Sequence, residues 1–122
     1  MDVEVSMDIH VEQYDEKEAT VVKILDASLN IFNFSELSRE LKSSLRRSAK
    51  SRVVFDLKNI KHIDSVGIGL LTMMKNMVAH DGADMAIACG NEGVLKVIDL
   101  LNMSGTLKSY KTLRDAIEKR EE

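Results

Sequence analysis

The feature that most constrains this chain is an alternation of short apolar runs with longer segments of helical spacing. Residues 52–57 (RVVFDL) and 83–89 (ADMAIAC) are mainly apolar and alternate little, which is typical of buried strands. Before, between and after these runs, apolar residues recur every three or four positions, as on one face of a helix. Because parallel strands need crossover connections, this order predicts an α/β fold with a mainly parallel sheet.

The same patterns divide the whole chain into elements. In chain order they predict a strand over residues 1–11, a turn over 13–17, a strand over 20–25, a helix from Phe34, a strand over 52–57, a loop over 58–64, a helix over 65–79, a strand over 83–89, a helix over 92–103, a short edge strand over 107–110 and a helix from Thr112. No internal repeat or low-complexity segment interrupts this order. We therefore expect residues 1–122 to form a single domain, a length that can bury one sizeable core.

The first eleven residues alternate between apolar side chains and mostly polar or charged ones. The apolar members are Met1, Val3, Val5, Met7, Ile9 and Val11. Alternation of this kind is typical of a strand with one face in solvent. Pairing through the turn at residues 13–17 would give an antiparallel hairpin with residues 20–25. We expect this hairpin at one edge of the sheet.

The first predicted helix has a clear apolar face and two candidate end signals. Its apolar positions are Phe34, Leu37, Leu41 and Leu45. Asn33 or Ser35 is suited to cap the helix start. The basic run with Arg46, Arg47 and Lys50 would complement the negative end of the helix dipole. The third predicted helix, over residues 92–103, also has an apolar face, made of Val94, Leu95, Ile98 and Leu101.

Charge, cysteine content and hydropathy exclude several classes of protein. With 17 Lys and Arg against 20 Asp and Glu, the chain has a net charge of −3 and lacks the basic footprint of a nucleic-acid binder. No apolar run is long enough to cross a membrane. Cys89 is the only cysteine, which excludes an intrachain disulfide and a cysteine zinc cluster. We expect a soluble protein of the cytoplasm that binds neither nucleic acid nor membrane.

The most informative segment for function is residues 59–71, which follow a predicted buried strand. Asp64 and Ser65 both suit the start of a helix, where free N–H groups need acceptors. Gly67 and Gly69 then lie in the first turns, where each glycine costs about 1 kcal/mol relative to alanine. Two explanations are open: close packing of this helix on the sheet, or close approach by the backbone of a partner.

The surrounding sequence resembles the signature of the STAS domain, the fold shared by sulfate transporters and anti-sigma-factor antagonists. Residues 53–71 are similar to its apolar strand, short loop, Asp-Ser-x-Gly motif and apolar helix. Residues 94–107 are similar to its penultimate helix and the turn that follows, here at Ser104 and Gly105. The resemblance implies a mixed, mostly parallel sheet with an N-terminal edge hairpin and about four helices, chiefly on one face.

The resemblance also implies a function, that of a bacterial anti-sigma-factor antagonist with no enzymatic activity and no cofactor. In this reading Ser65 is phosphorylated by the anti-sigma factor, which is itself a serine kinase. The unmodified protein sequesters that kinase, and the phosphorylated form releases it until a metal-dependent serine phosphatase restores the first state. Sigma-factor-dependent transcription is controlled in this way. The partner-binding residues implied are Asn30, Asp64, Ser65, Val66, Gly67, Ile68 and Gly69.

Three positions depart from the family pattern. Val66 replaces the second small hydroxyl residue that often follows the phosphoacceptor. Ala27 and Asn30 stand where the family commonly has the glycine and aspartate of a Gly-x-Leu-Asp turn. Asn30 can still form hydrogen bonds, but it carries no charge.

Two other functions remain as alternatives. The chain could be a STAS scaffold subunit of a larger signalling complex. Less favoured is a receiver-like domain phosphorylated on Asp56, because no acidic pair is found to hold its Mg²⁺. A metal site is not expected from the spacing of His10, His62 and His80. Cys89 and Met74, with the neighbouring methionines Met73 and Met77, are expected to fill the core.

Overall fold

The computed structural model describes residues 3–5, 9–48, 50–101 and 107–119, and a six-stranded mixed sheet lies at its centre. The strand order is β1 (Val3–Val5), β2 (Ile9–Tyr14), β3 (Ala19–Ile24), β5 (Arg52–Asp56), β7 (Asp84–Ala88) and β8 (Lys108–Tyr110). The pairs β1–β2 and β2–β3 are antiparallel, and the three pairs from β3 to β8 are parallel. A 3₁₀ turn at Asp15–Lys17 joins β2 to β3. The predicted sheet, mostly parallel with an N-terminal edge hairpin, is confirmed.

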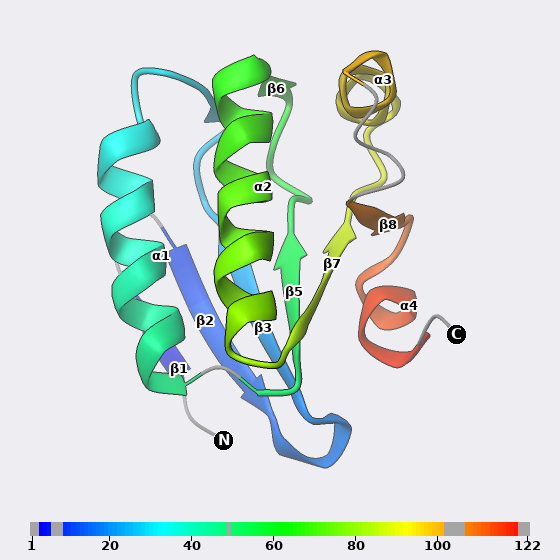
Figure 1. Cartoon of the computed structure of the whole chain (residues 1–122). Coiled ribbons are helices and arrows are strands. Elements are labelled where there is room, and N and C mark those ends of the chain that lie inside the picture. Colours follow the sequence, from blue (N-terminus) through cyan, green and yellow to red (C-terminus); the bar gives the residue numbers. More distant parts are fainter. Residues whose placement is uncertain (1–2, 6–8, 49, 102–106, 120–122) are drawn as a thin grey trace.

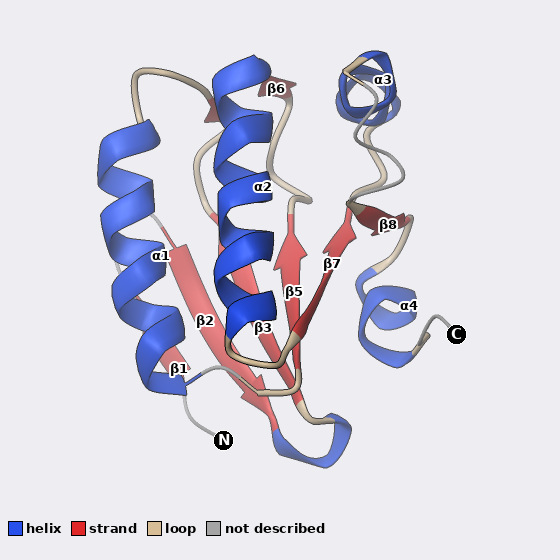
Figure 2. Ribbon diagram, in the orientation of Figure 1, coloured by secondary structure: helices blue, strands red, loops and turns tan. Residues whose placement is uncertain are grey.

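Four helices cover this sheet unequally (Figure 1). The helices α1 (Phe34–Ser48) and α2 (Ser65–His80) lie side by side on one face. The helix α3 (Glu92–Leu100) adds Val94 and Ile98 to the same core, whereas α4 (Leu113–Glu118) packs on the opposite face (Figure 2). The prediction of helices chiefly on one face is therefore confirmed.

The larger core lies between the sheet and the α1–α2 layer. All five residues of β5 are buried, as its unbroken apolar run predicts. Leu37, Leu41 and Leu45 of α1 are buried in this core, and so is Met74 of α2. The predicted helical spacing thus corresponds to the real inner face of α1, and the expected burial of Met74 is confirmed.

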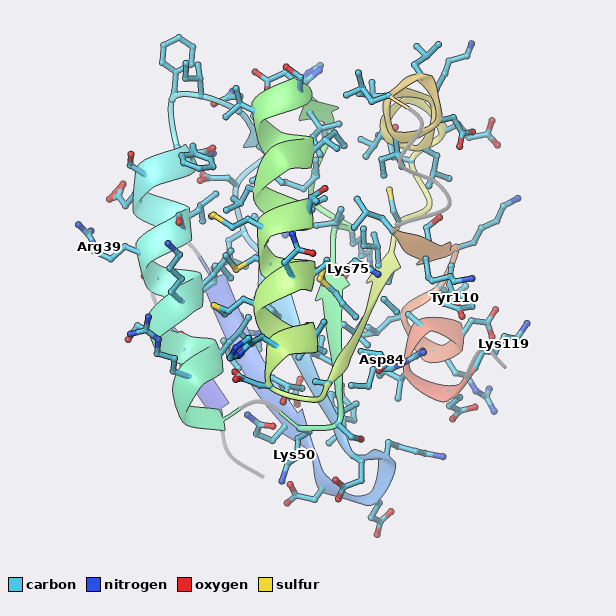
Figure 3. All side chains as sticks on the ribbon, in the orientation of Figure 1. Arg39, Lys50, Lys75, Asp84, Tyr110 and Lys119 are labelled. Carbon is cyan, nitrogen blue, oxygen red and sulfur yellow. The ribbon has the colours of Figure 1, made fainter. Side chains whose placement is uncertain are left out.

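The smaller core packs Ala116 and Ile117 of α4 on the other face of the sheet, and Arg52 adds hydrogen bonds to the C-terminal end of this helix. This side chain is almost fully buried, and its Nη1 donates to the backbone oxygens of Ala116, at 2.7 Å, and Lys119, at 2.5 Å. Its Nη2 donates to Oδ2 of Asp84 at 2.7 Å. Figure 3 labels Asp84, Tyr110 and Lys119 around α4. Burial alone would lower the pKa of Arg52, but its hydrogen bond and ion pair with Asp84 raise that pKa, so the guanidinium stays charged.

The structure corrects the predicted first strand. Instead of one strand over residues 1–11, β1 and β2 are separate and pair antiparallel, with Val3 opposite Glu12. Each strand of a hairpin alternates with the same period of two, so the apolar pattern cannot reveal where the chain reverses.

One smaller correction concerns a helix end, that of α3. At the end of α1, Lys50 forms an ion pair of 3.0 Å with Asp15 in the β2–β3 turn, and its role toward the dipole of α1 stays a prediction. The helix α3 ends at Leu100, and Leu101 is 40 % exposed, so Leu101 does not belong to the buried face. Ser104 and Gly105 lie outside the described residues.

Candidate functional site

A two-stranded parallel ladder beyond the main sheet organises the site. The strands β4 (Ser28–Leu29) and β6 (His62–Ile63) pair Ser28 with His62 and Leu29 with Ile63. The ladder joins the loop that follows β3 to the loop that follows β5, and the latter was predicted to lack secondary structure. Strands of two residues are too short for hydropathy periodicity to detect.

The ladder leads directly into the start of α2. The N–H of Asp64 donates to the backbone oxygen of Leu29 at 3.3 Å. The Asp64 side chain then caps the helix, because its Oδ1 accepts the N–H of Gly67 at 2.9 Å. This capping role of Asp64 is as predicted. Ser65 is the first helical residue, and its side chain is exposed.

The first glycine of the motif is required by packing inside the domain. A Cβ atom on Gly67 would lie 2.3 Å from the backbone oxygen of Leu29 and 2.8 Å from Cγ1 of Ile63. Of the two explanations left open by the sequence, close packing therefore accounts for Gly67. The packing partner is the β4–β6 ladder and not the main sheet. Gly69 is exposed, and a Cβ atom there would meet no atom within 4 Å.

The seven residues proposed for partner binding divide into exposed and buried members. Asp64, Ser65 and Gly69 are exposed, and Asn30 and Val66 are partly buried. Gly67 and Ile68 are buried, so they support the surface from within and do not form it. The exposed and partly buried members come together because β4 and β6 bring the residue after Leu29 beside the start of α2.

The turn from β4 into α1 is held by two asparagines. The N–H of Asn30 donates to Oδ1 of Asn33 at 3.0 Å, and Oδ1 of Asn30 accepts the N–H of Phe32 at 2.9 Å. Nδ2 of Asn33 donates to the backbone oxygen of Ser28 at 2.7 Å and to Oδ2 of Asp26 at 3.3 Å. The amide of Asn33 thus holds the turn before α1, and the capping of α1 by Asn33 or Ser35 stays a prediction.

This turn displays two apolar side chains that sequence reasoning did not single out. Ile31 is 64 % exposed and Phe32 is 94 % exposed, whereas the following Phe34 packs against the core. The sequence did contain a signal for this pair, because these two bulky apolar residues lie between a strand and a helix and fit neither the alternation of the strand nor the spacing of the helix.

The Ser65 hydroxyl is accessible and makes no hydrogen bond with any residue in the described ranges. An exposed hydroxyl at a helix start is open to the active site of another protein. No group of three or more His, Cys, Asp or Glu that could hold a metal ion occurs among the described residues. In the same part of the chain, no helix is long and apolar enough to cross a membrane.

Two other reactive side chains lie at the carboxyl ends of β5 and β7. Asp56 is 7 % exposed, and its Oδ1 accepts the N–H of Lys58 at 3.0 Å. Cys89 is buried, as predicted for a core thiol, and this burial raises its pKa. Both line a cavity of about 620 Å³ that Lys23 also borders. Neither side chain belongs to the surface around Ser65.

Comparisons with known proteins agree with this architecture. A family model described as STAS domain matches residues 10–116. A candidate anti-sigma factor antagonist from Thermotoga maritima is 24% identical over 98 residues, which are 80% of this chain and 87% of the relative.

Two solved structures show the same fold. An anti-sigma-factor antagonist (STAS) domain protein from Planctomyces limnophilus has a TM-score of 0.78 at 17% identity, over 93% of this chain and 97% of that one. The Bacillus cell fate determinant SpoIIAA, solved in its phosphorylated form, has a TM-score of 0.62 at 14% identity, over 89% and 96%.

Proposed function

Because this chain belongs to the STAS domain family, we propose that it is an anti-sigma-factor antagonist whose partner binding is switched by phosphorylation of Ser65. The unmodified protein binds an anti-sigma factor with serine-kinase activity and so frees a sigma factor in the cytoplasm. Phosphorylated protein releases the kinase, and a metal-dependent serine phosphatase reverses the modification. The protein itself catalyses no reaction in this cycle.

The observation that carries this proposal is the position of Ser65. It is an exposed serine on the first residue of α2, directly after the capping Asp64. The relatives support the partner class, because the similar protein of Thermotoga maritima is described as a candidate anti-sigma factor antagonist. Modification is supported by the Bacillus relative of the same fold, which has been solved in a phosphorylated form.

The contact surface in this proposal comprises Asn30, Asp64, Ser65, Val66 and Gly69. Gly67 and Ile68 contribute by setting the position of the first turn of α2 against the β4–β6 ladder. Asn30 makes its hydrogen bond within the turn through an uncharged amide, so the kinase is expected to meet a neutral side chain there.

Phosphorylation acts by local charge in this proposal. The phosphate adds about −1.5 to −2 charges at neutral pH, next to the carboxylate of Asp64. The helix start favours that charge by about 0.3–1 kcal/mol, so the domain itself changes little. A partner that must desolvate both anions loses several kcal/mol, and about 1.4 kcal/mol is tenfold in affinity.

The test is phosphorylation by defined kinases. Each serine-kinase anti-sigma factor of the source genome is purified and incubated with this protein and Mg-ATP, and the modified residue is mapped by mass spectrometry. We expect acid-stable phosphate on Ser65, abolished by Ser65→Ala and unaffected by Ser35→Ala, a serine exposed in the first turn of α1.

Three results would contradict the proposal. Acid-labile phosphate on Asp56 would indicate a receiver-like function. Phosphorylation of the Ser65→Ala variant with unchanged stoichiometry would show that another residue accepts the phosphate. A large assembly of many copies that phosphorylation leaves unchanged would favour a scaffold role.

A further inference from the structure

We propose that Ile31 and Phe32 are the apolar anchor by which this domain binds its protein partner. The two residues stand at the tip of the turn formed by residues 30–33, between β4 and α1, and we call this turn the anchor loop. The inference rests on the proposed function, because it assigns a further part of the surface that contains Ser65.

The first argument is the exposure of these side chains. Phe32 is 94 % exposed and Ile31 is 64 % exposed, and neither belongs to the hydrophobic core. Single exposed apolar residues are common on protein surfaces, but two adjacent bulky ones form a patch that association with a partner would bury. Aromatic side chains are also enriched among the residues that dominate binding energy at interfaces.

The second argument is that the anchor loop is held in one conformation. Asn30 accepts the N–H of Phe32, and Asn33 bonds the N–H of Asn30 and the backbone oxygen of Ser28. These bonds tie the loop together around its two exposed apolar side chains. A loop ordered before binding loses less conformational entropy when a partner covers it.

The third argument is continuity with the surface around Ser65. Leu29, the residue before the anchor loop, accepts the N–H of Asp64 and lies against Gly67. The β4–β6 register therefore ties the loop to the first turn of α2. Figure 1 shows the loop and the start of α2 at the same end of the molecule. A partner that reaches the Ser65 hydroxyl can cover the anchor loop in the same contact.

The chemistry around the loop favours one kind of occupant. Asp26, Glu36 and Asp64 border it, and their carboxylates would repel an anionic lipid surface. Two side chains also supply far less than the roughly 800 Å² that each partner buries in a stable interface, so the loop alone is too small to drive self-association. The occupant is the anti-sigma factor, with an apolar recess and a basic rim beside its catalytic site.

The experiment uses the kinase identified by phosphorylation of Ser65. Its dissociation constant is measured by calorimetry, without ATP, for wild type, Phe32→Ala, Ile31→Ala and the control Leu100→Ala. Leu100 is 77 % exposed on α3, which Figure 1 shows on the other side of α2 from the anchor loop. We expect Phe32→Ala to weaken binding about tenfold to hundredfold, Ile31→Ala less, and Leu100→Ala less than twofold.

The outcomes separate this inference from the proposed function. If wild type and Phe32→Ala bind the kinase equally tightly, the anchor is refuted while the proposed function stands. If no kinase of the source genome binds or phosphorylates the wild-type protein, both the anchor and the proposed function are refuted. A wild-type dimer that Phe32→Ala converts to a monomer, or binding of wild type to vesicles of anionic lipid, would assign the loop to another occupant. Nearly unchanged urea unfolding of each variant is expected, since these side chains are mostly exposed.

Discussion

Alanine at the two glycines of α2 should have opposite effects on stability, and the contrast tests how the site is built. At Gly67 the added Cβ atom would lie 2.3 Å from the backbone oxygen of Leu29, whereas ordinary contacts begin near 3.4 Å. The carbonyl must therefore move by about 1 Å, or α2 must shift by the same amount. Because Leu29 also accepts the N–H of Asp64, either movement disturbs the β4–β6 ladder.

The magnitude for Gly67→Ala combines three effects. Overpacking of a close contact costs about 1–3 kcal/mol, and a weakened hydrogen bond costs about 0.5–1.5 kcal/mol. Alanine returns about 1 kcal/mol through its higher helix propensity. We expect a net loss of about 1–3 kcal/mol in the free energy of unfolding.

Gly69→Ala is the matched control in the same helix. Its Cβ atom would meet nothing within 4 Å, so only helix propensity changes, and we expect a gain of about 0.5–1 kcal/mol. Urea unfolding followed by circular dichroism at 222 nm measures both variants. If Gly67→Ala stabilises the protein as much as Gly69→Ala does, the contact with Leu29 is not the reason for glycine at position 67.

Three further predictions concern the helix cap, the buried arginine and the thiol. Asp64→Ala should lose about 1 kcal/mol in urea unfolding, and Asp64→Asn, which keeps an acceptor, should recover most of it. Arg52→Met should lose about 2–3 kcal/mol and speed amide exchange in α4, whereas Arg114→Met, whose side chain is 83 % exposed, should change stability by less than about 0.5 kcal/mol. Burial raises the pKa of Cys89, so the thiol ionises at a lower pH in the unfolded chain than in the folded protein. The free energy of unfolding should therefore fall as pH rises above about 8.5, and Cys89→Ala should remove that part of the decline. A pH dependence that is the same in both proteins would contradict this assignment.

Local sequence patterns predicted the parts of the fold that depend on neighbouring residues. The strands β5 and β7 follow from their apolar runs and the inner face of α1 from its apolar spacing, because burial imposes the pattern of the element. Asp64 could also be identified as a helix cap from local sequence, because its carboxylate and the N–H group that it accepts from are only three residues apart. The mainly parallel pairing of the sheet then followed from the order of the elements.

The tertiary structure alone decided how the site is assembled. The β4–β6 ladder joins residues more than thirty positions apart, and its two-residue strands leave no periodic signal. Only this pairing explains why Gly67 must lack a side chain. The hydrogen bonds of Asn33 and the exposure of Ile31 and Phe32 belong to the folded turn, and residue spacing does not encode them. The contact at Gly67 depends on which backbone group of a distant segment lies within contact distance, and that is set by the packed fold and not by local spacing.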